Sequence, residues 1–87
     1  MNIEQLRADT PAVAQLIHFN NAGAALMPTP VIDTVTRHLQ LEARLGGYEA
    51  AAQWSAELEN VYGAIARLIN AQLDEIAVIE NATRAWD

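Results

Sequence analysis

The feature that most constrains the fold is a run of residues from position 51 to 69 in which apolar side chains recur in alternating steps of three and four. This spacing lines up side chains on one face of an α-helix, which turns once in about 3.6 residues. The face is formed by Ala51, Ser55, Leu58, Tyr62, Ile65 and Ile69, and is widened by Trp54, Val61 and Leu68. We expect a long amphipathic helix that begins near Tyr48 and Glu49 and packs along its length.

A second helix is predicted before this one. Thr29 and Pro30 are typical of a helix start, because a hydroxyl residue caps the first turn and proline tolerates the first helical position. Gly46 and Gly47 predict its end, since glycine adopts the left-handed backbone of a helix C-cap. Its buried stripe is expected to consist of Val31, Val35 and Leu39, with Ile32 alongside. Together the two helices predict a helical hairpin over residues 29–73.

Residues 1–28 are expected to form an amino-terminal arm. Ile3 and Leu6 predict a short amphipathic helix before Pro11, and residues 16–19 a short extended stretch. The residues Asn20-Asn21-Ala22-Gly23 are typical of a turn, because Asn and Gly tolerate positive φ angles.

Residues 74–87 carry a different pattern. The run Ile76-Ala77-Val78-Ile79 is short, apolar and rich in β-branched residues, which predicts a strand buried on both faces, as in a parallel sheet. Asn81 or Thr83 then predicts the cap of a following helix. A strand followed by a helix is half of a βαβ unit, so we expect residues 1–87 to form a single incomplete unit: mostly α, a helical hairpin with one or two short strands.

Composition excludes several classes of function. The chain has no cysteine, which removes disulfides and thiolate chemistry, and a net charge of −6 with scattered arginines, which argues against nucleic-acid binding. No apolar run approaches the ~20 residues of a membrane span, and the amino terminus lacks the pattern of a signal peptide. These observations favour a cytoplasmic location.

Asn81, Ala82 and Thr83 form the clearest candidate site. The first N–H groups of a helix are unpaired and carry partial positive charge, and a threonine hydroxyl adds a donor, so this turn is suited to holding a phosphate. The alternative is that Asn81 or Thr83 only caps the helix.

The order of several motifs resembles a known family. "FNNAGAALMPTPVIDTVTRHL", "RLGGYEAA" and "DEIAVIENATRAWD" together are similar to the amino-terminal part of class V aminotransferases and their cysteine desulfurase-like relatives. Those proteins are pyridoxal phosphate (PLP) enzymes of the α/β fold type I. The resemblance implies a parent that acts on a small-molecule amino acid by transamination, desulfuration or a related route. It implies as partners the remainder of the parent polypeptide and a second subunit. Apolar faces left exposed without that remainder would also favour self-association.

The resemblance also implies roles for individual residues. Ala82 and Thr83, with Asn81 beside them, would contact the cofactor phosphate, and Asn21 with Ala22 would lie near the substrate side of the pocket. The sequence departs from the family where Asn81 replaces a glycine and where Ala85 and Trp86 replace polar residues. We expect Trp86 to pack rather than to lie against the cofactor.

The absence of lysine limits the chemistry. PLP catalysis requires a lysine amine that forms an imine with the cofactor, and arginine cannot replace it because it stays protonated. The chain alone is therefore expected to lack catalytic residues, although it could bind the PLP phosphate without reacting.

Other polar residues give weaker signals. His18 and His38 lie on different predicted elements without metal-site spacing, and Glu57 and Glu59 point to different helix faces, so neither a metal site nor a catalytic carboxylate pair is predicted. A second hypothesis needs no cofactor: the chain would be a small acidic helical module whose amphipathic helix docks on a partner protein.

Overall fold

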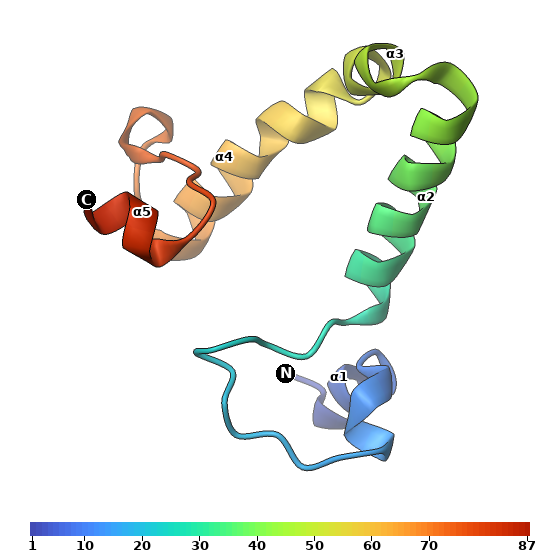
Figure 1. Cartoon of the computed structure of the whole chain (residues 1–87). Helices are drawn as coiled ribbons and strands as arrows, with labels where there is room; N and C mark the ends of the chain where they lie inside the picture. Colours follow the sequence, from blue (N-terminus) through green and yellow to red (C-terminus); the bar gives the residue numbers. More distant parts are fainter. The chain divides into compact units, whose positions relative to one another are not determined.

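The computed structural model describes residues 1–87 and contains only helices, turns and irregular segments (Figure 1). The chain divides into two compact units, Met1–Gly47 and Tyr48–Asp87. None of the helices combines the length and apolar character that a membrane span requires.

The first unit begins with the short helix α1 (Ile3–Ala8) and the 3-10 turn η1 (Pro11–Ala14), which confirms the helix predicted before Pro11. The Asn2 side chain caps α1 by accepting a hydrogen bond from the Gln5 N–H at 3.1 Å. An irregular segment follows, and the Thr29 N–H returns to donate to the Asp9 carbonyl at 2.6 Å. This bond ties the start of the next helix to the end of α1.

Helix α2 (Thr29–Leu45) has the length that the sequence predicts. Its N-cap is Pro28, and the Thr29 hydroxyl forms no capping hydrogen bond, so the predicted cap lies one residue too late. Gly46 ends the helix with φ 89° and ψ 159°, a region of backbone space that essentially only glycine adopts.

Residues 47–69 form two helices where the sequence predicts one. Helix α3 (Gly47–Gln53) and helix α4 (Ser55–Ile69) are separated at Trp54, whose φ of −99° and ψ of 15° depart from helical values. The hydrogen bonds nevertheless continue, because Trp54 donates to the Ala50 carbonyl and accepts from the Leu58 N–H, both at 3.0 Å. The break is therefore a local distortion of one helical path.

Helix α4 ends at Asn70, which takes the left-handed conformation with φ 58° and ψ 47°. The Ala71 N–H then donates to the Ala66 carbonyl at 2.9 Å, which satisfies a carbonyl of the last turn. The 3-10 turn η2 (Leu73–Glu75) follows and packs against α4. It is held by a capping box in which the Gln72 N–H donates to the Glu75 carboxylate at 2.7 Å.

The predicted strands are absent. Residues 76–79 and residues 16–19 have no regular secondary structure. A strand requires hydrogen bonds to a neighbouring strand, and no segment of this chain supplies them. The part of the fold prediction that calls for one or two strands is therefore wrong for this chain, and the mostly helical part is confirmed.

The expected buried stripes are largely exposed. On α2, Val31, Val35 and Leu39 are 45%, 49% and 60% exposed, because no other element of the first unit packs extensively along this helix. On α4, Leu58 and Ile69 are 51% and 61% exposed. Only Leu41, Ala50 and Ala66 are buried apolar residues, so the helices depend mainly on their own hydrogen bonds and caps.

Substitution of Gly46 tests the end of α2. Gly46→Ala forces a side chain into the glycine-only backbone region and is expected to destabilise the end of the helix by about 1–3 kcal/mol. The measurement is amide hydrogen exchange at Arg44 and Leu45. Gly47→Ala is the matched control, because nothing lies within 4 Å of its added Cβ. Equal protection in the two variants would contradict this account of the helix end.

Candidate functional site

The candidate phosphate-binding turn lies at the start of helix α5 (Ala82–Trp86). Asn81 is the N-cap, with an extended backbone of φ −163° and ψ 166°. Its side-chain oxygen accepts a hydrogen bond from the Arg84 N–H at 2.8 Å. Asn81 therefore caps α5. A helix cap was one of the two roles predicted for this turn, and phosphate binding was the other.

Capping by Asn81 leaves other donors of the turn free. The N–H groups of Ala82 and Thr83 and the Thr83 hydroxyl form no hydrogen bond in the structure, and both residues are exposed. Two backbone donors and one hydroxyl therefore face solvent at the positive end of a short helix. These are donors of the kind that an anion accepts from, and the turn carries no group that transfers a proton.

Charged side chains flank the turn on both sides. The Arg84 guanidinium lies 3.8 Å from the Glu80 carboxylate, and the two side chains are 70% and 71% exposed. An ion pair this exposed contributes little to stability, so either side chain is free to turn toward a ligand. Arg84 is the only cation among residues 76–87.

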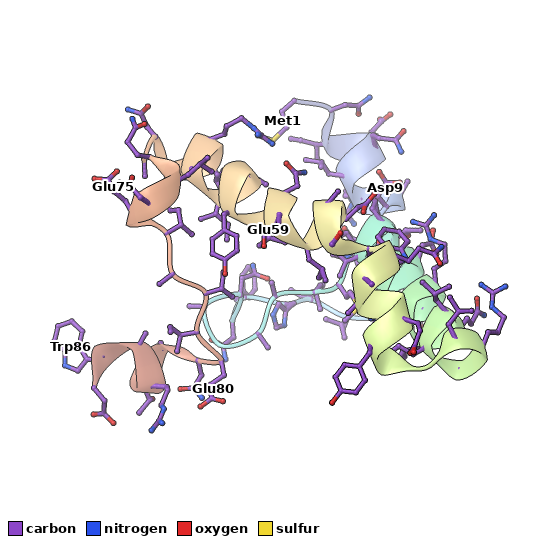
Figure 2. All side chains as sticks on the ribbon, turned by 90° about the horizontal axis from the view of Figure 1, so that it is seen from above. Met1, Asp9, Glu59, Glu75, Glu80 and Trp86 are labelled. Carbon is purple, nitrogen blue, oxygen red and sulfur yellow. The ribbon has the colours of Figure 1, made fainter.

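Trp86 does not pack as expected. It is 93% exposed, and Figure 2 shows its ring directed away from α5. No element of its unit packs extensively against α5, which corrects the expectation of packing.

The predicted substrate-side residues, Asn21 and Ala22, lie at the tip of a turn in the first unit. The Asn20 carbonyl accepts from the N–H groups of Gly23 and Ala24, both at 3.1 Å. His18 Nε2 lies 2.8 Å from the Ala24 carbonyl oxygen and braces the same turn. Asn21 and Ala22 are both exposed and make no contact that defines a pocket by itself.

The two groups of predicted site residues belong to different units, Asn21 and Ala22 to the first and Asn81, Ala82 and Thr83 to the second. Each group is preorganised locally by an asparagine, Asn20 in one turn and Asn81 in the other. Their assembly into one pocket stays a prediction.

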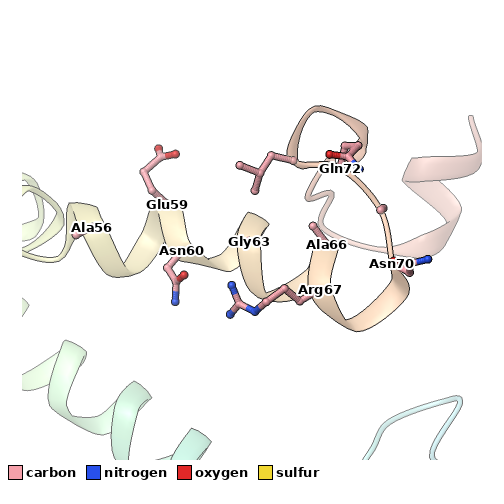
Figure 3. A pocket seen from close by; sticks show the side chains of 10 residues that line it. Ala56, Glu59, Asn60, Gly63, Ala66, Arg67, Asn70 and Gln72 are labelled. Carbon is pink, nitrogen blue, oxygen red and sulfur yellow. The ribbon is translucent and has the colours of Figure 1, made fainter.

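A groove that the sequence did not indicate lies along α4 and the segment after it (Figure 3). Its volume is about 780 Å³, and its polar lining includes Glu59, Asn60, Arg67, Asn70 and Gln72. Figure 3 shows Asn60 and Arg67 extending from the same side of α4. Gly63 lies between them. A glycine within an otherwise regular helical pattern is the sequence feature that could have indicated this groove.

The titratable side chains form few ion pairs. His38 Nε2 lies 3.1 Å from the Glu42 carboxylate on α2, one turn away. No group of three or more His, Asp or Glu side chains lies close enough together to hold a metal ion.

Comparison with known proteins gives one relevant similarity. No protein-family model matches the sequence, and no solved structure matches it. A probable cysteine desulfurase of Pyrococcus abyssi (strain GE5 / Orsay) is 29% identical over 85 residues, which cover 94% of this chain and 21% of the relative. The chain therefore spans about one fifth of the length of the relative that it matches.

Replacement of Asn81 tests the preorganisation of the turn. Asn81→Ala removes the acceptor of the Arg84 N–H and is expected to weaken the start of α5 by about 1 kcal/mol. The measurement is the exchange rate of the Arg84 amide proton. Asn81→Ser supplies another capping oxygen and should stay close to the wild type. An unchanged rate in Asn81→Ala would show that the cap does not hold the turn.

Proposed function

We propose that this chain is the amino-terminal portion of a PLP-dependent protein of the class V aminotransferase and cysteine desulfurase-like group. In this role it contributes part of the site for the cofactor phosphate. It does not carry the catalytic lysine, because it contains no lysine at all.

The observation that carries the proposal is the similarity to the probable cysteine desulfurase, which extends over nearly the whole chain. An alignment of this length includes many elements in the same order, whereas a shared helix would give only a short match. The relative is several times longer than the region matched. We therefore assign the choice of reaction type to parts of such a protein beyond the matched region.

The geometry of the α5 turn supports the part of the proposal that concerns phosphate. The free N–H groups of Ala82 and Thr83 and the Thr83 hydroxyl are the donors that a phosphate accepts from. Asn81 stands at the position where the family has glycine, and its side-chain oxygen is engaged with the Arg84 N–H. The cap therefore occupies the Arg84 N–H and leaves the N–H groups of Ala82 and Thr83 as the donors for an anion.

The proposed roles of the first unit rest on the resemblance. Asn21 and Ala22 would lie on the substrate side of the pocket, at the tip of the turn that Asn20 and His18 brace. A turn held by such hydrogen bonds loses little conformational entropy when its tip contacts a ligand, which suits a segment that lines a binding site.

Titration with PLP tests the phosphate role. We expect chemical-shift changes at the amides of Ala82 and Thr83, with a dissociation constant on the order of millimolar because the turn is open to solvent. Thr83→Val removes the hydroxyl and should weaken binding about three- to tenfold, whereas Thr83→Ser should retain it. Pyridoxal, which has no phosphate, is the ligand control. Equal shifts with pyridoxal, or shifts confined to other amides, would contradict the phosphate role.

Borohydride reduction tests the absence of a catalytic amine. Incubation with PLP followed by borohydride should label no side chain, because the amino group of Met1 is the only amine in the chain that can form an imine. Peptide mapping by mass spectrometry locates any reduced adduct. A label on an internal peptide would overturn the assignment.

The second candidate is an acidic helical module that docks on a partner protein. The exposure of apolar residues on the long amphipathic helix favours it, because Leu58 and Ile69 of α4 are 51% and 61% exposed and an exposed apolar stripe is typical of helices that bind in grooves. The two candidates differ in their response to PLP: a docking module has no reason to bind phosphate at Ala82 and Thr83.

A further inference from the structure

The groove along α4 surrounds a position where the helix has no side chain (Figure 3). Glu59, Gly63 and Arg67 follow one another in steps of four residues, so they lie on one face of the helix. An acid or a base on a helix commonly pairs with a residue four positions away. On this face that position is Gly63 for both Glu59 and Arg67, and a glycine has no side chain to pair with.

The two charges that flank Gly63 are unpaired. Neither the Glu59 carboxylate nor the Arg67 guanidinium forms an ion pair or a side-chain hydrogen bond with another residue. Their Cα atoms are about 12 Å apart along the helix axis, which is too far for a direct pair between them. An acid and a base therefore line the same groove without a partner.

Three side chains surround the empty position over Gly63. A Cβ atom placed on this glycine would lie 3.5 Å from Arg67 Nη1, 3.6 Å from Asn60 Oδ1 and 3.8 Å from Leu73 Cδ2. The Arg67 side chain thus runs back along α4 toward Asn60, as Figure 3 shows. The space over Gly63 is bounded by a cation, a carboxamide that can donate or accept, and a methyl group.

We propose that this groove binds a small zwitterion whose carboxylate and ammonium groups are several bonds apart, as in an ω-amino acid. Arg67 and the Asn60 carboxamide bind the carboxylate, and Glu59 binds the ammonium group. The aliphatic chain of the ligand lies over Gly63 and against Leu73. The groove volume of about 780 Å³ is in the range of small-molecule sites. This inference does not depend on the phosphate role of the α5 turn.

The charges favour a zwitterion over a singly charged ligand. The net charge of −6 repels a simple anion, and Glu59 in the groove lining adds to this repulsion. A simple cation would leave the Arg67 guanidinium unpaired beside a like charge. A zwitterion has no net charge and gives each side chain a partner. An α-amino acid is too short to contact both, because it carries its amine and carboxyl groups on the same carbon.

Titration with γ-aminobutyrate, followed by NMR, tests the proposal. We expect saturable shifts at the Gly63 amide and the Arg67 Nε–H, with a dissociation constant on the order of 10 mM because both ion pairs are open to solvent. Butyrate lacks the ammonium group, butylamine lacks the carboxylate, and free glycine holds its charges too close together. Each of these should bind about threefold more weakly or worse. Butyrate binding as tightly as γ-aminobutyrate would overturn the proposal, as would shifts confined to Ala82 and Thr83.

Gly63→Ala fills the empty position. The added methyl group reaches ordinary contact distances from its neighbours, and alanine favours a helix, so the variant should fold at least as well as the wild type. Binding of γ-aminobutyrate should nevertheless be lost. Gly47→Ala adds the same group outside the groove, with nothing within 4 Å of it, and should bind like the wild type. Unchanged binding in Gly63→Ala, with helix content verified by circular dichroism, would overturn the proposal.

Removal of single charges separates the two ion pairs. Arg67→Gln and Glu59→Gln should each weaken binding about three- to fivefold, because each removes one partner of the ligand. Arg44→Gln on α2 and Glu57→Gln on α4 remove the same charges at exposed positions outside the groove lining, and they should leave binding unchanged. Equal weakening in the groove variants and in these controls would show only an effect of net charge and would overturn the proposal.

Discussion

Backbone hydrogen bonding determines which parts of this chain are regular. A helix satisfies its N–H and carbonyl groups within one segment, whereas a strand needs a second segment. The regions with helical patterns are therefore ordered as α2, α3 and α4, and the region with a strand pattern has no regular structure and no backbone partner. The few buried apolar side chains agree with this: local hydrogen bonds, rather than a core, maintain the helices.

Much of the helical structure could be predicted from particular residues. Pro30 placed the start of α2 within a residue, and Gly46 placed its end, because both residues restrict the backbone at their own positions. The distortion at Trp54 could not be predicted, since the apolar pattern continues through it and no glycine or proline marks the site. The strand at residues 76–79 was wrong for a different reason: its pattern describes a buried environment that the chain does not supply.

In the candidate site, too, some features could be predicted from the sequence and others could not. Asn81 as a cap followed from its residue type, and the structure confirms its bond to the Arg84 N–H. The exposed position of Trp86 did not follow, because apolar character predicts burial only where another element lies within reach. The groove beside Gly63 depends on the conformation of residues 70–73, which the left-handed backbone of Asn70 sets and which periodicity does not describe.

The hydrogen bond between the Thr29 N–H and the Asp9 carbonyl closes a ring of backbone that contains η1 and the turn at Asn20. Closure of a ring of this size costs entropy, so a single bond holds the ring only while the residues inside it keep their own short-range bonds. Local order around Asn20 and anchoring at Thr29 are thus thermodynamically linked. A ligand that stabilised the Asn21 tip would also slow fraying at the first turn of α2.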